Sequence, residues 1–192
     1  RMAARTRNSL ALSLLLWLAL GLFFVKASQV NFLLFHTLAE FFSIVIGCGV
    51  FFIVYNSTFV KKYASIEIIG IGLLCVSVVD LIHTLGYQGM GVFPDRDANF
   101  PTQLWLAGRY LMAATFLFAS LWTGDRMNRL GIAAIYTAAT FLLLYAIFQG
   151  LFPDAYLEGT GLTPFKIASE YVVCSLFLLS AILFHLRREK MD

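Results

Sequence analysis

The sequence predicts an all-α integral membrane protein, a bundle of six transmembrane helices with both termini in the cytoplasm. Composition, the lengths of the apolar stretches and the placing of basic residues lead to this prediction. Of 192 residues, 60% are hydrophobic and only 13% are charged, and the mean hydropathy is +0.81. Soluble domains average about 25% charged residues. The composition therefore excludes an ordinary soluble domain and favours a chain embedded in lipid.

Six apolar stretches are each close to the ~20 residues that cross a bilayer. They cover residues 10–25, 31–55, 66–85, 104–123, 130–152 and 167–186. The first follows three arginines and could be read as a secretory signal, since Val25-Lys26-Ala27 resembles a cleavage site. Its length favours a retained helix instead.

Lysine and arginine in the connections predict the orientation, because they are enriched in cytoplasmic loops. Arg109 falls inside a span, and the other basic residues divide ten to three between the two sides. The ten are Arg1, Arg5, Arg7, Lys61, Lys62, Arg126, Arg129, Arg187, Arg188 and Lys190, and the three are Lys26, Arg96 and Lys166. The larger group marks the cytoplasmic side, which puts both termini there.

The connections between the spans are too short to fold as separate domains. The longest predicted outer loops cover residues 86–103 and 153–166, and the inner loops are shorter. We expect one transmembrane sensor domain over residues 1–186. Residues 187–192 keep helical character, and we expect them to begin a cytoplasmic linker to an output domain.

The three cysteines lie singly in apolar runs, with no C-x-x-C pattern. Such spacing does not indicate a disulfide framework or a thiolate metal site. We expect buried thiols at Cys48, Cys75 and Cys174.

Two short polar segments within the apolar spans contain the candidate functional residues. His36 and Glu40 are four residues apart, and Asp80 and His83 are three apart, so each pair shares one helix face. Charged groups in the hydrocarbon core raise the free energy by at least ~2.5–3.5 kcal/mol on insertion scales and are usually functional or paired. With the predicted topology, both pairs lie in the outer leaflet.

Three more residues fall at the same predicted depth. Arg109 lies about one and a half turns into its span, Trp105 precedes it by one turn, and Glu170 begins the last span. Arg109 needs an anionic partner, and Glu40 and Asp80 are the natural candidates. Trp105 could stack on the guanidinium or lie over a flat ligand.

We therefore predict one ligand site lined by His36, Glu40, Asp80 and His83, with Trp105 and Arg109 at its edge. Imidazoles with surplus carboxylates suit a transition-metal ion, so these first four residues are also the candidate metal ligands. Haem, held by two histidines, and a small amphiphile anchored on Arg109 are the other candidates. Structural alternatives stand beside these: Arg109 and Glu170 reaching the interface, and the two pairs bridging helices.

Three separated segments resemble a known family. Residues 35–43 (FHTLAEFFS), 80–90 (DLIHTLGYQGM) and 104–110 (LWLAGRY) look like the third type of membrane-associated sensor domain, the MASE group. The similarity is clear over residues 30–125. It implies a non-enzymatic input domain in the bacterial inner membrane, at the N-terminus of a diguanylate cyclase or histidine kinase, often with PAS modules between.

The leading functional prediction is a sensory domain that binds a ligand in its outer-leaflet pocket and controls a cytoplasmic output. Its expected partners are membrane lipids, a small ligand or metal, and a second copy through the output region, but no nucleic acid. The alternative is an intramembrane metal-dependent enzyme or redox protein. No H-E-x-x-H motif supports that alternative. A transporter is disfavoured, because polar residues are confined to one half of the spans.

Overall fold

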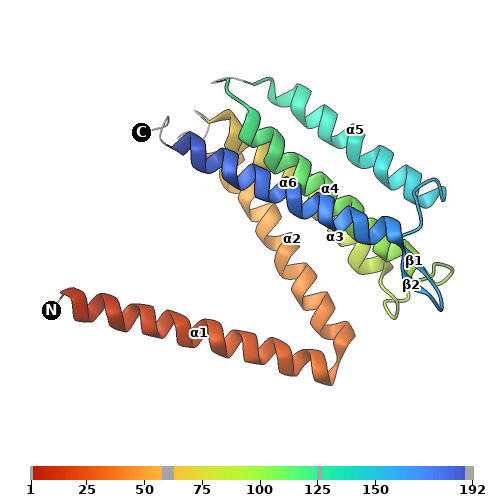
Figure 1. Cartoon of the computed structure of the whole chain (residues 1–192), viewed down its shortest axis with the longest axis horizontal. Coiled ribbons are helices and arrows are strands. Elements are labelled where there is room, and N and C mark those ends of the chain that lie inside the picture. Colours follow the sequence, from red (N-terminus) through yellow and green to blue (C-terminus); the bar gives the residue numbers. More distant parts are fainter. Residues whose placement is uncertain (1, 58–62, 125–126, 189–192) are drawn as a thin grey trace. The chain divides into compact units, whose positions relative to one another are not determined.

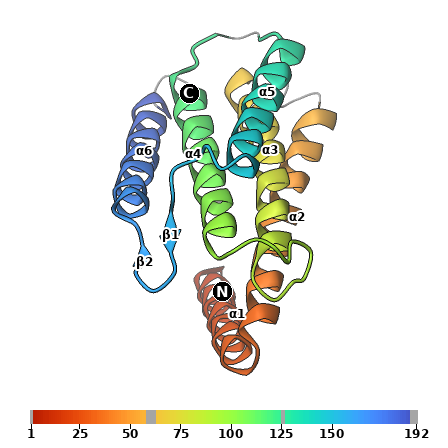
Figure 2. The ribbon, with the colours of Figure 1, turned by 90° about the vertical axis from the view of Figure 1, so that its right-hand side faces the viewer.

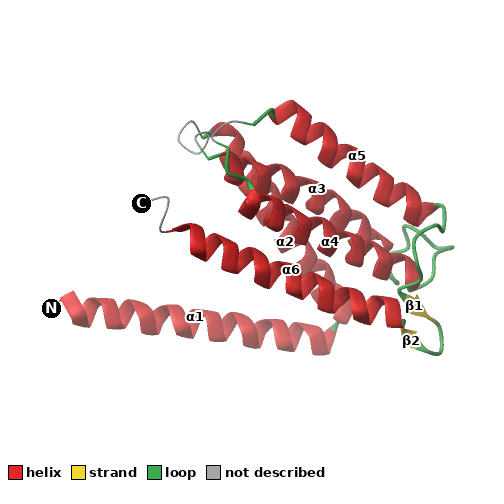
Figure 3. Ribbon diagram, turned by 45° about the horizontal axis from the view of Figure 1, so that its top comes forward, coloured by secondary structure: helices red, strands yellow, loops and turns green. Residues whose placement is uncertain are grey.

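The computed structural model describes residues 2–57, 63–124 and 127–188, and almost all of them are helical. The elements are α1 (Met2–Val30), α2 (Phe32–Asn56), α3 (Ala64–Gly86), α4 (Asn99–Leu121), α5 (Arg129–Phe148), β1 (Tyr156–Leu157), β2 (Gly161–Leu162) and α6 (Pro164–Arg188) (Figure 1). The two strands form one antiparallel hairpin before α6 (Figure 3). Within the described residues, six helices are long and apolar enough to cross a membrane. The predicted all-α, six-helix architecture is confirmed.

Several helices begin or end away from the predicted boundaries, and α1 runs well beyond the predicted 10–25 at both ends. α4 starts at Asn99 rather than Leu104, because the Asp97 carboxylate accepts hydrogen bonds from the Asn99 and Phe100 amides at 3.1 and 3.3 Å. Such an acceptor satisfies the first free amides of a helix. α5 ends at Phe148, four residues before the predicted end.

Two basic residues predicted in outer connections lie on helices instead. α1 runs through Lys26 to Val30, and only Asn31 separates it from α2. Lys166 lies in the first turn of α6, because Pro164 suits a helix start and the Thr163 hydroxyl accepts a hydrogen bond from the Lys166 amide. The membrane orientation stays a prediction. Of the basic residues assigned to the cytoplasmic side, Arg1, Lys61, Lys62, Arg126 and Lys190 lie outside the described residues.

The chain divides into two compact units, residues 1–39 and 40–192. In the first unit, the Asn31 side chain accepts a hydrogen bond from the Leu34 amide at 3.0 Å and so caps α2. The rings of Phe24 and Phe35 meet edge to face at 5.9 Å. These contacts define the turn between α1 and α2.

In the second unit, α4 is the central helix and packs against α3, α5 and α6 (Figure 2). Its buried positions recur at helical spacing and include Phe100, Leu104, Ala107 and Leu111. The buried face of α3 follows the same rule with Ile68, Val76, Val79 and His83. The polar residues of α3 therefore lie on the face that its core residues define.

Small residues let these helices approach closely, as is usual in membranes. Gly72 of α3 lies directly against Thr115 of α4. Gly108 of α4 lies against Asp80, where a Cβ atom would be 3.0 Å from the carboxylate Oδ1. The absence of a side chain at Gly108 is what admits the Asp80 carboxylate to the helix interface.

Polar side chains fix both ends of α4. At its start, Asn99 Nδ2 donates to Asp154 Oδ1 at 2.7 Å, and Gln103 Nε2 donates to the Phe152 carbonyl at 3.0 Å. At its end, the Arg187 guanidinium of α6 donates to the carbonyls of Leu121 and Trp122 at 2.9 and 2.8 Å. Arginine commonly bonds the last carbonyls of a helix in this way.

Candidate functional site

The candidate site begins with a histidine and a carboxylate on facing helices. His83 Nε2 of α3 lies 3.9 Å from Glu40 Oε1 of α2, and the two side chains are 5% and 15% exposed. This distance is too long for a direct hydrogen bond. The two groups face each other between α2 and α3.

The other nitrogen of His83 determines what faces Glu40. Nδ1 lies 2.7 Å from the carbonyl oxygen of Pro101, in the first turn of α4. A carbonyl only accepts hydrogen bonds, so Nδ1 carries the proton and donates it. In the neutral imidazole, Nε2 then presents its lone pair toward the Glu40 carboxylate. A backbone carbonyl that fixes the tautomer in this way is typical of histidines that bind metal ions.

A second pair links α3 to α4. Arg109 Nη2 lies 3.5 Å from Asp80 Oδ1, and the two side chains are 19% and 2% exposed. The predicted contact of Arg109 with a buried carboxylate is thus present. Because α4 starts at Asn99, Arg109 lies ten residues, or about 15 Å at ~1.5 Å per residue, along the helix. The one and a half turns predicted from the sequence were too few.

A third pair lies within α6 and contacts Trp105 of α4. Lys166 Nζ donates to Glu170 Oε1 at 2.8 Å and also lies 3.6 Å from the centroid of the Trp105 ring. The Arg109 guanidinium is 5.3 Å from the same centroid, so the predicted contact between Trp105 and Arg109 is present. Two cations thus flank one indole, as cation–π interactions favour.

His36 lies on α2, one turn before Glu40. Within its own unit it stacks on Phe32 with a distance of 6.3 Å between ring centroids. The unbroken helix keeps the four-residue spacing that places His36 and Glu40 on one helical face.

Two contributors to the site escaped prediction from the sequence. From the sequence, Lys166 is assigned to a loop next to Pro164. The one signal for its helical position is Pro164 itself, which is favoured at the first position of a helix and begins α6. The Pro101 carbonyl has no side-chain signature at all. Cys174 also differs from prediction, since its thiol is exposed rather than buried. It lines an open pocket between α4 and α6, which leaves it accessible, and Cys48 and Cys75 are only partly buried.

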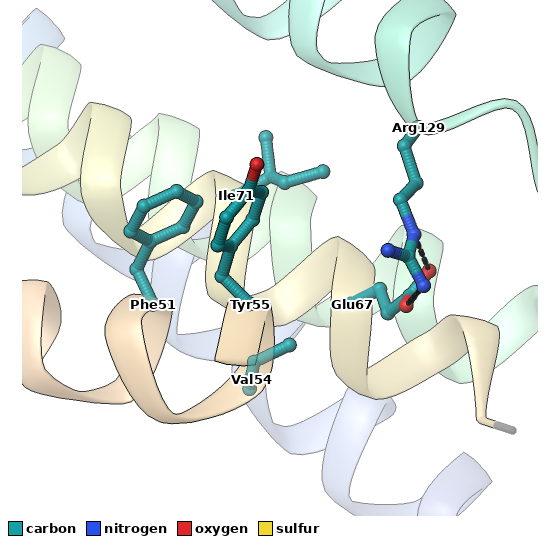
Figure 4. A pocket seen from close by; sticks show the side chains of 6 residues that line it. All are labelled: Phe51, Val54, Tyr55, Glu67, Ile71 and Arg129. Carbon is teal, nitrogen blue, oxygen red and sulfur yellow. Dashed lines mark hydrogen bonds and ion pairs between the residues drawn. The ribbon is translucent and has the colours of Figure 1, made fainter. Parts of the chain in front are cut away.

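A further ion pair lies near the opposite ends of the helices, where α3 and α5 begin. Glu67 of α3 accepts two hydrogen bonds from Arg129 of α5, one of them from Nε at 3.1 Å (Figure 4). The adjoining pocket has a volume of about 20 Å³ and is walled by Phe51, Tyr55 and Ile71. That volume suits roughly one water molecule. The pair therefore joins two helices and is not a candidate ligand site.

Fold and contacts together define a helical membrane protein that carries a buried cluster of ionisable side chains. The model of the MASE3 family, described as a membrane-associated sensor domain, matches residues 27–192. The chain belongs to this family, which confirms the resemblance found in its three motifs. Comparisons with curated proteins and with solved structures returned no match.

Proposed function

We propose that this MASE3 domain senses a transition-metal ion that binds between Glu40 and His83. The observation that carries the proposal is the position of the His83 ring, with Nδ1 on the Pro101 carbonyl and Nε2 facing Glu40. In this tautomer, two electron-pair donors face each other at 3.9 Å. A bridging cation turns their repulsion into attraction.

Distance and charge both support a cation. Ligand nitrogen and oxygen atoms lie ~2.0–2.2 Å from a zinc-like ion. A separation of 3.9 Å is shorter than two such bonds, so one ion reaches both atoms. The two carboxylates, Glu40 and Asp80, exceed the one guanidinium of Arg109 and leave a net charge of −1 with His83 neutral. Excess negative charge inside a membrane is stabilised by a bound cation.

Asp80 joins the ligand set proposed for this unit. His36 stays a candidate ligand on the strength of its four-residue spacing to Glu40 in the sequence. Asp80 shares a face of α3 with His83 and holds Arg109 beside the site, with Trp105 at its edge. Between the two proposed cofactors, the bare ion suits these residues better than haem. Haem iron is usually held by histidine, methionine, cysteine or tyrosine, whereas histidine with carboxylate is a common ligand set for a zinc-like ion.

Signalling requires that the ion bind two conformations with different affinity. The site residues lie on α2, α3 and α4, and α4 packs on α6 and bonds to it through Arg187. A shift of α4 on ion binding would therefore move α6. We propose that α6 passes this movement to a diguanylate cyclase or histidine kinase output, dimerised through that region, in the bacterial inner membrane.

Elemental analysis and an absorption spectrum of the purified protein test the proposal. We expect about one transition-metal ion per chain and no haem band. Glu40→Gln and His83→Ala should each lower the bound metal by at least about tenfold, since even outer partners of metal ligands contribute 10- to 100-fold to affinity.

Two matched controls come from the same chain. Glu170→Gln removes a carboxylate whose partner is Lys166, and His185→Ala removes an exposed histidine. Both should keep the metal. Metal-free wild-type protein, or equal metal loss in the controls, would contradict the proposal.

A further inference from the structure

We propose a second binding site, a groove between α4 and α6 that takes a neutral, membrane-dissolved amphiphile with a carbonyl acceptor, the chemistry of a quinone. The groove has a volume of about 360 Å³. Pockets that bind small molecules usually hold ~300–1,000 Å³. It therefore has room for a head group with part of its chain.

The groove has an apolar length and a polar end. Leu106, Val173 and Phe177 supply apolar walls, while Arg109 and Glu170 stand at the polar end. Such a division matches an amphiphile, whose chain packs on apolar side chains while its head meets a few placed polar groups.

Arg109 supplies the donor for the head group. Its contacts in the described part of the chain are long, 3.5 Å to Asp80 Oδ1 and 4.0 Å to Met112 Sδ. Hydrogen bonds between guanidinium and carboxylate usually measure ~2.7–2.9 Å. The guanidinium has five N–H donors, so capacity remains for an acceptor oxygen in the groove.

Charge balance selects a neutral ligand. Two cations, Arg109 and Lys166, lie beside two carboxylates, Asp80 and Glu170, each cation paired with one of them. The groove is thus neutral as it stands. An anionic or cationic head group would bring an unbalanced charge into the hydrocarbon core, which is unfavourable. A carbonyl oxygen accepts from Arg109 without adding charge.

Trp105 lines the groove and gives a direct readout, because quinones quench indole fluorescence on contact. The background variant Trp17→Phe/Trp122→Phe leaves Trp105 as the single tryptophan of the chain. The protein, purified with its bound metal into lipid nanodiscs, is titrated with decylubiquinone. We expect saturable quenching of Trp105. Linear, non-saturating quenching would overturn the proposal.

Matched substitutions on α6 separate groove binding from partitioning into lipid. Cys174 and Val172 are both exposed, but only Cys174 lines the groove. Cys174→Phe should weaken the saturable quenching at least about tenfold by filling the groove, and Val172→Phe should leave it unchanged. Equal effects of the two variants would refute the site.

Further measurements identify the chemical class of the ligand and distinguish this groove from the proposed metal site. Arg109→Gln should weaken decylubiquinone binding about tenfold or more, because the loss of a hydrogen bond to a charged group typically lowers affinity by at least this factor. Dodecanoate should not compete; competition by it would show an anionic amphiphile and overturn the neutral assignment. Cys174→Phe should retain its metal content, so metal loss from the Glu40–His83 site and failure of the groove are distinguishable.

Discussion

The buried pair of Asp80 and Arg109 makes the sharpest energetic prediction, which a double-mutant cycle measures. The charges lie 3.5 Å apart, and Asp80 is 2% exposed in its side chain. At an effective dielectric constant of ~20, two unit charges at this distance attract by about 5 kcal/mol. Removing one partner leaves the other charge buried, which is typically destabilising by ~3–5 kcal/mol.

The cycle compares Asp80→Asn, Arg109→Gln and the double variant by unfolding in mixed micelles with increasing denaturing detergent. Each single change should lower the free energy of unfolding strongly, and the double variant should lose less than their sum. We expect a coupling energy of about 2–4 kcal/mol, within the range known for close charge pairs. Additive effects, with coupling below ~0.5 kcal/mol, would refute the pairing.

Three other predictions concern packing, the C-terminal end of α4 and membrane topology. Gly108→Ala should lower the free energy of unfolding by ~1–3 kcal/mol because its Cβ meets a carboxylate oxygen at 3.0 Å, whereas Gly49→Ala has open space and should not destabilise the fold. Arg187→Gln should raise the rate of amide hydrogen exchange at the C-terminal end of α4, because the carbonyls of Leu121 and Trp122 lose their hydrogen-bond donor. An unchanged exchange rate would show that these two hydrogen bonds do not stabilise the helix end. A cysteine at Arg96 should react with an impermeant maleimide in intact cells and one at residue 62 should not; the reverse result would invert the membrane orientation.

Much of the fold could be predicted from the sequence because lipid imposes strict rules. Apolar stretches long enough to cross a bilayer have no stable alternative to helices there, so six spans were predictable within a few residues. Their ends were less so. Asp97 extends the start of α4 through local hydrogen bonds that hydropathy does not report, so Arg109 lies further along the helix than predicted.

The charge pairing within the candidate site could be predicted from the sequence, but the backbone contact that orients His83 could not. The cost of a lone charge in lipid led to Glu40 and Asp80 as the candidate partners of Arg109, and the structure shows Asp80 in contact with it. Helical spacing placed His83 on the same face as Asp80. The Pro101 carbonyl, which sets the His83 tautomer, depends on how closely α3 and α4 approach. That approach follows from small residues such as Gly108, whose effect appears only once the helices are packed.

Lys166 illustrates a different limit. The orientation rule treats a lysine near a span as a loop residue in water, yet this side chain is 5% exposed between Glu170 and Trp105. A long apolar stem allows such a residue to lie along a helix while its ammonium group finds local partners. Counting charges per loop therefore overstated the outer positive charge.

X-ray absorption at the edge of the metal found by elemental analysis tests the central claim most directly, because it reports the atoms around the ion. The account predicts a first shell of nitrogen and oxygen at ~2.0–2.2 Å, with the outer-shell signature of imidazole. In His83→Ala that signature should weaken or the metal should be lost. A shell of sulfur at ~2.3 Å, or a spectrum unchanged by His83→Ala, would contradict a cation held between Glu40 and His83.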